Sequence, residues 1–133
     1  DVIEYLTRSD TLIDRLGGPE RRMFVAVADR RVVGVAATRW SGDGPAELAG
    51  IIVLQEMIGH GVGTRLLQVA LDGLAADGAR SLFVRTEADN ERAIGFYRSR
   101  GFGGERRLTD DVARAQMALT ELRRSIGGDA PPH

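Results

Sequence analysis

The sequence predicts an α/β fold organised around one strand–loop–helix unit, and three consecutive patterns indicate it. Residues 51–54, Ile-Ile-Val-Leu, are apolar and rich in β-branched residues, which is typical of a short buried strand. The glycine-rich segment Gly59–Gly63, Gly-His-Gly-Val-Gly, follows after four residues. Apolar residues then recur at the spacing of one helix face: Leu66, Leu67, Ala70, Leu71, Leu74 and Ala75. Gly78 stands where a left-handed glycine would end that helix.

The glycine-rich segment predicts a binding site for an anion. Glycines let the backbone come close to a ligand, and the first amides of a helix have no partners within the helix. The helix dipole also favours negative charge at this end, so we expect a phosphate group here. The candidate binding residues are Gly59, His60, Gly61, Val62, Gly63 and Thr64.

Two well-known phosphate loops fit this segment poorly. A P-loop ends in Gly-Lys-Ser/Thr, whereas Gly63 is followed directly by Thr64 with no lysine. The Rossmann fingerprint places G-x-G-x-x-G directly after the strand, whereas here the third glycine position falls on Thr64. Glu87, at the end of a later predicted strand, could act as the ribose-binding acid, so a dinucleotide-binding fragment stays an alternative.

Two segments together resemble the GNAT superfamily of N-acetyltransferases. The stretch IIVLQEMIGHGVGTRLL resembles the coenzyme A motif of that family, Q/R-x-x-G-x-G/A after a strand, except that the Gln/Arg position is Ile58. Residues 90–102 resemble its second signature, N-x-x-A-x-x-x-Y-x-x-x-G-F. Two signatures in the correct order are far more specific than one glycine loop, and the resemblance extends over residues 24–122.

The resemblance implies a mixed, mostly antiparallel central sheet flanked by helices. Strands over residues 47–54 and 80–86 should run parallel, joined through the helix as a βαβ coenzyme A-binding unit. The pantetheine arm of the coenzyme should enter where these two strands splay apart. Residues 112–122 fit either a helix or a strand, and the resemblance favours a strand.

The remaining segments complete the expected domain. Apolar spacing over residues 1–16 predicts helix, so the chain offers no candidate for the first strand that family members usually have. We expect one domain over residues 1–126 and a flexible tail over 127–133. The other expected elements are strands over 23–28 and 32–39 forming a hairpin, a helix over 91–100 and a strand over 102–108.

The second signature supplies two candidate site residues. Asn90 and Tyr97 are two helical turns apart and share a face with the small Ala93. By resemblance, Tyr97 is the general acid that protonates the leaving thiolate, and Asn90 contacts coenzyme A. The resemblance also implies that the Ile51 amide polarises the acetyl carbonyl and that the strand Ile51–Ile52–Val53 binds the pantetheine arm.

Glu47 is the candidate general base, because an ammonium acceptor must lose a proton before it attacks a thioester. Some family members carry a strand glutamate at this position. Others place a carboxylate where this chain has Arg85, so Glu87, Asp89 and water remain alternatives. Strand alternation places Glu47, Ala49 and Ile51 on one face, with Glu47 roughly 13 Å from Ile51 at about 3.3 Å per residue. This distance suits a relay through water or a shortened path at a bulge.

Composition argues against several function classes. The chain has 133 residues and a net charge of −1, so strong attraction to nucleic acid or to an anionic membrane is not expected. It has no cysteine and only two histidines, so we expect no disulfide, no cysteine nucleophile and no metal site. No apolar run approaches the roughly twenty residues that span a bilayer. We expect a cytoplasmic monomer or homodimer.

The resemblance implies transfer of an acetyl group from acetyl-CoA to a primary amine of a small molecule or peptide. The amine would attack directly within a ternary complex. A non-catalytic acyl-CoA-binding or regulatory module on the same fold is the alternative, because a fold does not fix a function. The identity of the acceptor stays open.

Overall fold

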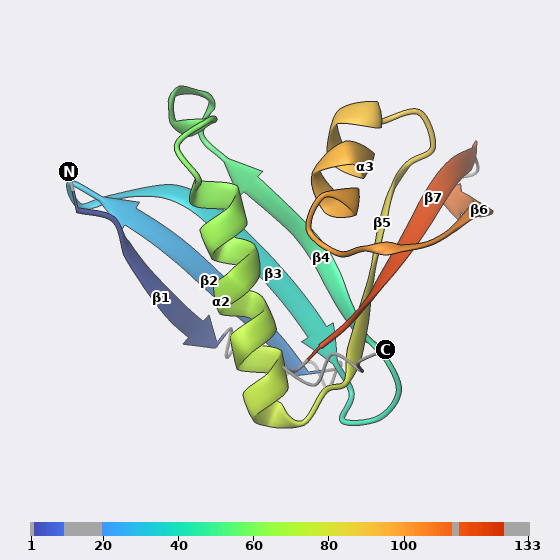
Figure 1. Ribbon diagram of the computed structural model, residues 1–133, viewed down its shortest axis with the longest axis horizontal. Helices are drawn as coiled ribbons and strands as arrows, with labels where there is room; N and C mark the ends of the chain where they lie inside the picture. The colour runs from blue at the N-terminus through green and yellow to red at the C-terminus, as the bar shows by residue number, and fades with distance from the viewer. Residues whose placement is uncertain (1, 10–19, 113–114, 127–133) are drawn as a thin grey trace.

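The computed structural model describes residues 2–9, 20–112 and 115–126, and these residues form a seven-stranded sheet with helices packed on one face (Figure 1). The elements in chain order are β1 (Glu4–Ser9), β2 (Glu20–Ala28), β3 (Arg31–Trp40), β4 (Ala46–Val53), the 3-10 helix η1 (Gln55–Met57), α2 (Val62–Asp77), β5 (Ser81–Glu87), α3 (Glu91–Arg98), β6 (Gly103–Val112) and β7 (Ala115–Ser125). The strand order is β1-β2-β3-β4-β5-β7-β6. Neighbouring strands are antiparallel except β4 and β5, which confirms the predicted mixed sheet and its βαβ unit.

The first segment of the chain is an edge strand, so the helix predicted there is wrong. β1 pairs antiparallel with β2 from Glu4 to Ser9. Ile3 and Tyr5 pack against the core, which is the period of two that a strand requires. Val2 and Leu6 are 84% and 46% exposed, and these exposed apolar residues gave the segment its misleading helical spacing. Residues 10–16, the second half of the predicted helix, lie outside the described residues.

The last predicted element is a strand, as the resemblance favours. β7 pairs with β5 from Leu119 to Ser125 and with β6 on its other edge. Neighbours on both sides decide in favour of a strand where the apolar spacing alone allowed both structures. Ile126 is buried, and its amide donates to the Arg80 carbonyl at 2.8 Å. The predicted tail, residues 127–133, lies outside the described residues.

Helix α2 lies close against β2 and β3 because glycines remove side chains at the contact. A Cβ atom on Gly34 would lie 2.9 Å from side-chain atoms of Val62 and Leu66, and one on Gly73 would lie 3.0 Å from the Phe24 ring. The buried face of α2 is the predicted apolar stripe, and the helix ends at Gly78 with φ of 100°. The close packing of α2 on β2 and β3 determines where the first turn of α2 lies relative to the sheet.

A β-bulge interrupts β4. Thr38 of β3 pairs with Leu48, whereas Ala37 pairs with Gly50, so β4 carries one extra residue at Ala49. A bulge adds local twist and bends the strand that contains it. The bulge therefore marks the point where β4 changes direction relative to its neighbours.

Strands β4 and β5 separate at the bulge. They pair in parallel only through Ala46–Leu48 of β4 and Leu82–Val84 of β5. Beyond these pairs the two strands diverge, as Figure 1 shows, and helix α3 lies between them in this view. Within the described part of the chain, the β5-facing edge of β4 has no strand partner from Ala49 to Val53, so its backbone polar groups are available to a ligand.

Candidate active site

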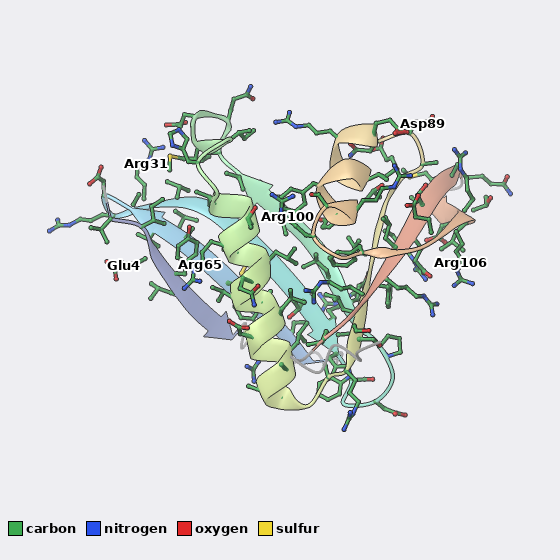
Figure 2. All side chains as sticks on the ribbon, in the orientation of Figure 1. Glu4, Arg31, Arg65, Asp89, Arg100 and Arg106 are labelled. Carbon is green, nitrogen blue, oxygen red and sulfur yellow. The ribbon has the colours of Figure 1, made fainter. Side chains whose placement is uncertain are left out.

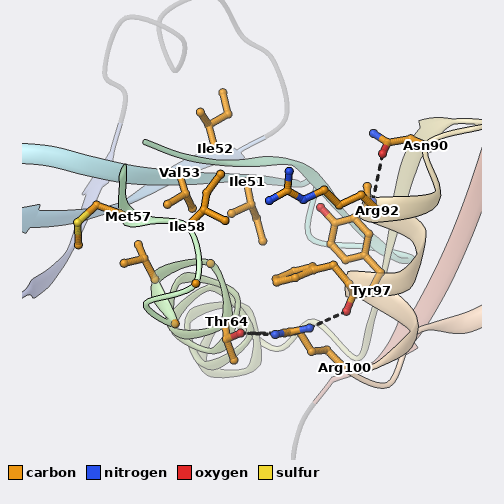
Figure 3. Close-up of a pocket in the computed structure, with 16 residues that line it drawn as sticks. Ile51, Ile52, Val53, Met57, Ile58, Thr64, Asn90, Arg92, Tyr97 and Arg100 are labelled. Atoms are coloured by element: carbon orange, nitrogen blue, oxygen red, sulfur yellow. Dashed lines mark hydrogen bonds between the residues drawn. The ribbon is translucent and has the colours of Figure 1, made fainter. Parts of the chain in front are cut away.

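A pocket of about 680 Å³ opens where β4 and β5 diverge. This volume is within the usual range for small-molecule and cofactor sites, about 300–1,000 Å³. Figure 3 shows the pocket between β4, the loop before α2, and α3. Its lining includes most of the predicted binding residues: Ile51, Ile52, Val53, Gly59, Gly61, Val62, Gly63, Thr64, Asn90 and Tyr97.

The loop before α2 presents open backbone amides to this pocket. Gly61, the residue before the helix, has φ of 79° and offers no side chain to cap it. The first helical hydrogen bond is from the Arg65 amide to the Gly61 carbonyl, at 3.0 Å. The amides of Val62, Gly63 and Thr64 therefore have no intrahelical acceptor, and the first turn contains no acidic residue that would compete with an anion.

Asn90 has a structural role in addition to its place in the pocket. It precedes α3, and its side-chain oxygen accepts a hydrogen bond from the Ala93 amide at 3.1 Å (Figure 3). Such a cap stabilises a helix by about 1 kcal/mol. The cap occupies the oxygen of the side chain and leaves its amide NH₂ group as a donor toward the pocket.

Tyr97 is buried in the wall of the pocket. Its ring makes edge contacts with Phe96 and Phe102, with centroid distances of 5.3 and 5.2 Å. Figure 3 shows the side chain extending from α3 toward Ile51 and Arg92. Burial raises the pKa of the Tyr97 hydroxyl above its ordinary value of 10.0, so this group holds its proton throughout the neutral range.

Glu47 lies on the other face of the sheet, so the predicted alignment of Glu47 with Ile51 is wrong. Leu48 and Ile51 both pack toward the helices although they are three residues apart, because the bulge at Ala49 shifts the alternation. Glu47 therefore points away from the pocket, and its carboxylate accepts a hydrogen bond from Arg39.

The structure keeps His60 out of the pocket. This residue is exposed at the tip of the loop and is not among the pocket-lining residues, in contrast to the prediction that included it. Six further residues line the pocket and were not among the predicted binding residues: Met57, Ile58, Arg92, Ala93, Phe96 and Arg100. The signal for the last two is their spacing, because Ala93, Phe96 and Arg100 follow at intervals of three and four residues.

Comparison with known protein families matches residues 3–102 to the family described as Acetyltransferase (GNAT) family. The chain belongs to the GNAT family. The donor that this family uses is acetyl-CoA, and the site has features that fit it. The free amides in the first turn of α2, and two arginines in a pocket lining that contains no carboxylate, suit the phosphates of the coenzyme. The edge of β4 that faces away from β3 suits the amide groups of the pantetheine arm.

Individual relatives agree with this GNAT assignment. N-alpha-acetyltransferase 30 of Schizosaccharomyces pombe is 34% identical over 89 residues, which is 64% of this chain and 59% of that protein. A GNAT-family acetyltransferase from Elizabethkingia anophelis, solved with acetyl-CoA bound, has a TM-score of 0.70 at 16% identity, covering 95% of this chain and 99% of that one. A GNAT-family structure from Desulfovibrio desulfuricans has a TM-score of 0.77 at 18% identity, covering 95% and 100%.

The GNAT fold is thus present over the sheet and the helices that build the pocket. At these low identities the two structures support the fold alone. Across residues 2–9, 20–112 and 115–126, no helix combines the length and the apolar character needed to cross a bilayer.

Proposed function

We propose that this GNAT protein transfers the acetyl group of acetyl-CoA to a primary amine of a small molecule or peptide, by direct attack in a ternary complex. The observation that carries the proposal is the pocket at the splayed strands. It has backbone amides without intrahelical acceptors at one end and a protonated tyrosine between β4 and α3 at the other. The similarity to an N-alpha-acetyltransferase supports an amine acceptor.

The chain contributes two groups near the reacting bond in this proposal. Acetyl-CoA supplies an activated acetyl thioester. The Ile51 amide donates a hydrogen bond to the acetyl carbonyl and stabilises the negative charge that develops there. The Tyr97 hydroxyl gives its proton to the sulfur that leaves as the carbon–nitrogen bond forms and the carbon–sulfur bond breaks. Tyr97 is then returned to its protonated form from solvent.

The amine needs a proton acceptor, and we propose Glu47 acting through water. The helices cover the pocket side of the sheet, so an amine can approach the acetyl group from the opposite face. Glu47 is on that face and pairs with Phe83 at the base of the splay. Its carboxylate accepts a hydrogen bond from Arg39, which holds the side chain in place on that face.

The test of the proposed function is a binding and turnover experiment on the whole chain. Isothermal titration should detect coenzyme A binding, and excess NAD should not compete. Acetyl-CoA should then release free thiol when a suitable amine from a panel of amino acids, antibiotics and peptides is added. Binding of NAD in place of coenzyme A would overturn the GNAT donor site. Coenzyme A binding without any acetylated amine across the panel would favour an acyl-CoA-binding module.

Replacing Glu47 should have a partial, pH-dependent effect. We expect Glu47→Gln to lower kcat/KM several-fold near neutral pH, an effect within the range of general base catalysis. Raising the pH should restore much of the rate, because more of the amine is then already neutral. The measurement is a pH–rate profile of wild type and variant with one verified amine.

Glu87→Gln is the matched control, because Glu87 is an exposed carboxylate at the end of β5. It should leave the profile unchanged. If Glu47→Gln and wild type gave the same profile while Glu87→Gln differed, the base would be Glu87 and not Glu47. Coenzyme A affinity should be equal in all three proteins.

A further inference from the structure

Arg100 connects the two helices across the pocket (Figures 2 and 3). It follows α3, and its guanidinium donates to the Thr64 hydroxyl oxygen of α2 through Nε at 2.9 Å and Nη2 at 2.6 Å. Nη1 donates to the Phe96 carbonyl at 3.0 Å and to the Ser99 hydroxyl at 2.7 Å. The guanidinium also lies 3.8 Å from the centroid of the Phe96 ring. The side chain is therefore held in one place on the pocket wall.

These contacts determine what the Thr64 hydroxyl can do. A hydroxyl has one donor and two acceptor lone pairs, and Arg100 occupies the acceptor side with two N–H groups. The remaining hydrogen-bonding capacity of Thr64 is its own proton. Thr64 is in the first turn of α2, beside the open amides of Val62 and Gly63, and lines the pocket. Arg100 therefore leaves the Thr64 hydroxyl as a hydrogen-bond donor, next to the amide donors of Val62 and Gly63.

Arg100 is one of two positively charged side chains in a pocket lining that contains no carboxylate. The other is Arg92. Ile58, at the motif position where the GNAT pattern has Gln or Arg, is apolar and 45% exposed, so the loop itself adds no side-chain donor there. Arg92 is exposed, whereas Arg100 is partly buried and fixed by hydrogen bonds.

We propose that Arg100 is a positioning residue for the diphosphate of acetyl-CoA. It fixes Thr64 as a hydrogen-bond donor and places a positive charge beside the anion, in the role that Ile58 cannot fill. The inference rests on the proposed function, because it assumes that the diphosphate lies against the first turn of α2. A hydrogen bond to a charged group contributes enough binding energy for its loss to be measured.

The test is calorimetric binding of three ligands to Arg100→Met. We expect roughly tenfold weaker binding of coenzyme A, which is the loss of about one charge-assisted hydrogen bond. Dephospho-coenzyme A, which keeps the diphosphate and lacks the 3′-phosphate, should lose the same factor. Pantetheine, which lacks both, should compete equally well against wild type and variant. Added salt should weaken coenzyme A binding less in Arg100→Met than in wild type.

Further variants distinguish a positioning role of Arg100 from a purely structural link between α2 and α3. Thr64→Val should weaken coenzyme A binding like Arg100→Met, and the double variant should be little weaker than either, because the two residues act as one unit. Arg98→Gln is the matched control, since Arg98 is the last residue of α3, pairs with Glu105 and does not line the pocket. It should bind coenzyme A as wild type does. Arg100→Lys should recover part of the affinity by restoring the charge.

The outcomes are distinct. Equal coenzyme A affinity of wild type and Arg100→Met overturns the inference, and so does a loss for pantetheine as large as the loss for coenzyme A. The second result would assign Arg100 to holding the helices together. Failure of wild type to bind any of the three ligands counts against the proposed function and not against Arg100 alone.

Discussion

Replacing Tyr97 by phenylalanine should lower kcat for acetyl transfer by about 100-fold, within the usual range for loss of a general acid. The ring packs against Phe96 and Phe102, and phenylalanine keeps these contacts, so the variant should fold and bind coenzyme A normally. The hydroxyl is the atom lost, and with it the proton for the leaving sulfur. A residual rate is expected, because a thiolate can depart unprotonated at some cost.

The pH dependence gives this prediction a second readout. Burial raises the pKa of Tyr97 above 10.0, so wild-type kcat should decline only at pH values above that of an ordinary tyrosine. The decline should be absent in Tyr97→Phe, which has no proton to lose. The measurement is single-turnover kinetics across pH, because slow product release in wild type would hide a change in the chemical step. An unchanged single-turnover rate removes Tyr97 from the acid role.

The central part of the fold could be predicted from the sequence because local rules determine it. The apolar stripe of α2, its end at Gly78 and the glycines before it are readable without tertiary structure. The same rules failed around β1, where Val2 before the strand and Leu6 within it are apolar but exposed. Here only Ile3 and Tyr5 pack against the core, so the alternation of apolar and polar residues that would predict a strand is weak.

The geometry around the site could not be predicted, because it depends on how strands pair. The bulge at Ala49 is visible only in the pairing of β3 with β4, and it moves Glu47 to the face opposite the pocket. Arg100 was equally hidden, since its partner Thr64 is 36 residues away in the sequence. Local patterns thus identified the loop and the tyrosine, and tertiary pairing decided which other side chains lie near them.

Glu121 is a charged strand residue that is only 1% exposed, and apolar periodicity gives no signal for a buried carboxylate. It lies on β7 and accepts hydrogen bonds from Arg85 of β5 at 3.1 Å, Arg106 of β6 at 3.0 Å and Arg123 of β7 at 3.2 Å. This cluster joins the three strands on the sheet face away from α2 and α3. It holds β5, one wall of the splay, against its neighbours.

Glu121→Gln should lower the free energy of unfolding by about 2 to 3 kcal/mol at pH 7. Removing one partner of a fully buried ion pair costs about 3 to 5 kcal/mol, and solvent around the half-exposed arginines reduces this. The measurement is urea denaturation of both proteins. Glu105→Gln is the matched control, because it breaks the exposed ion pair with Arg98 and should change stability much less.

The difference between wild type and Glu121→Gln should depend on pH in a defined direction. Burial raises the pKa of Glu121, but the hydrogen bonds from Arg106, Arg85 and Arg123 outweigh burial and hold it below the ordinary value. A carboxylate with a lowered folded-state pKa stabilises the fold above the unfolded-state pKa, about 4.3, and this contribution is lost as the pH falls through the folded-state value. The stability gap should therefore be full at pH 7 and narrow in acid. A gap that is constant from pH 7 into the acid range would show that glutamine disturbs packing, and that the charge of Glu121 contributes nothing to the stability of the sheet.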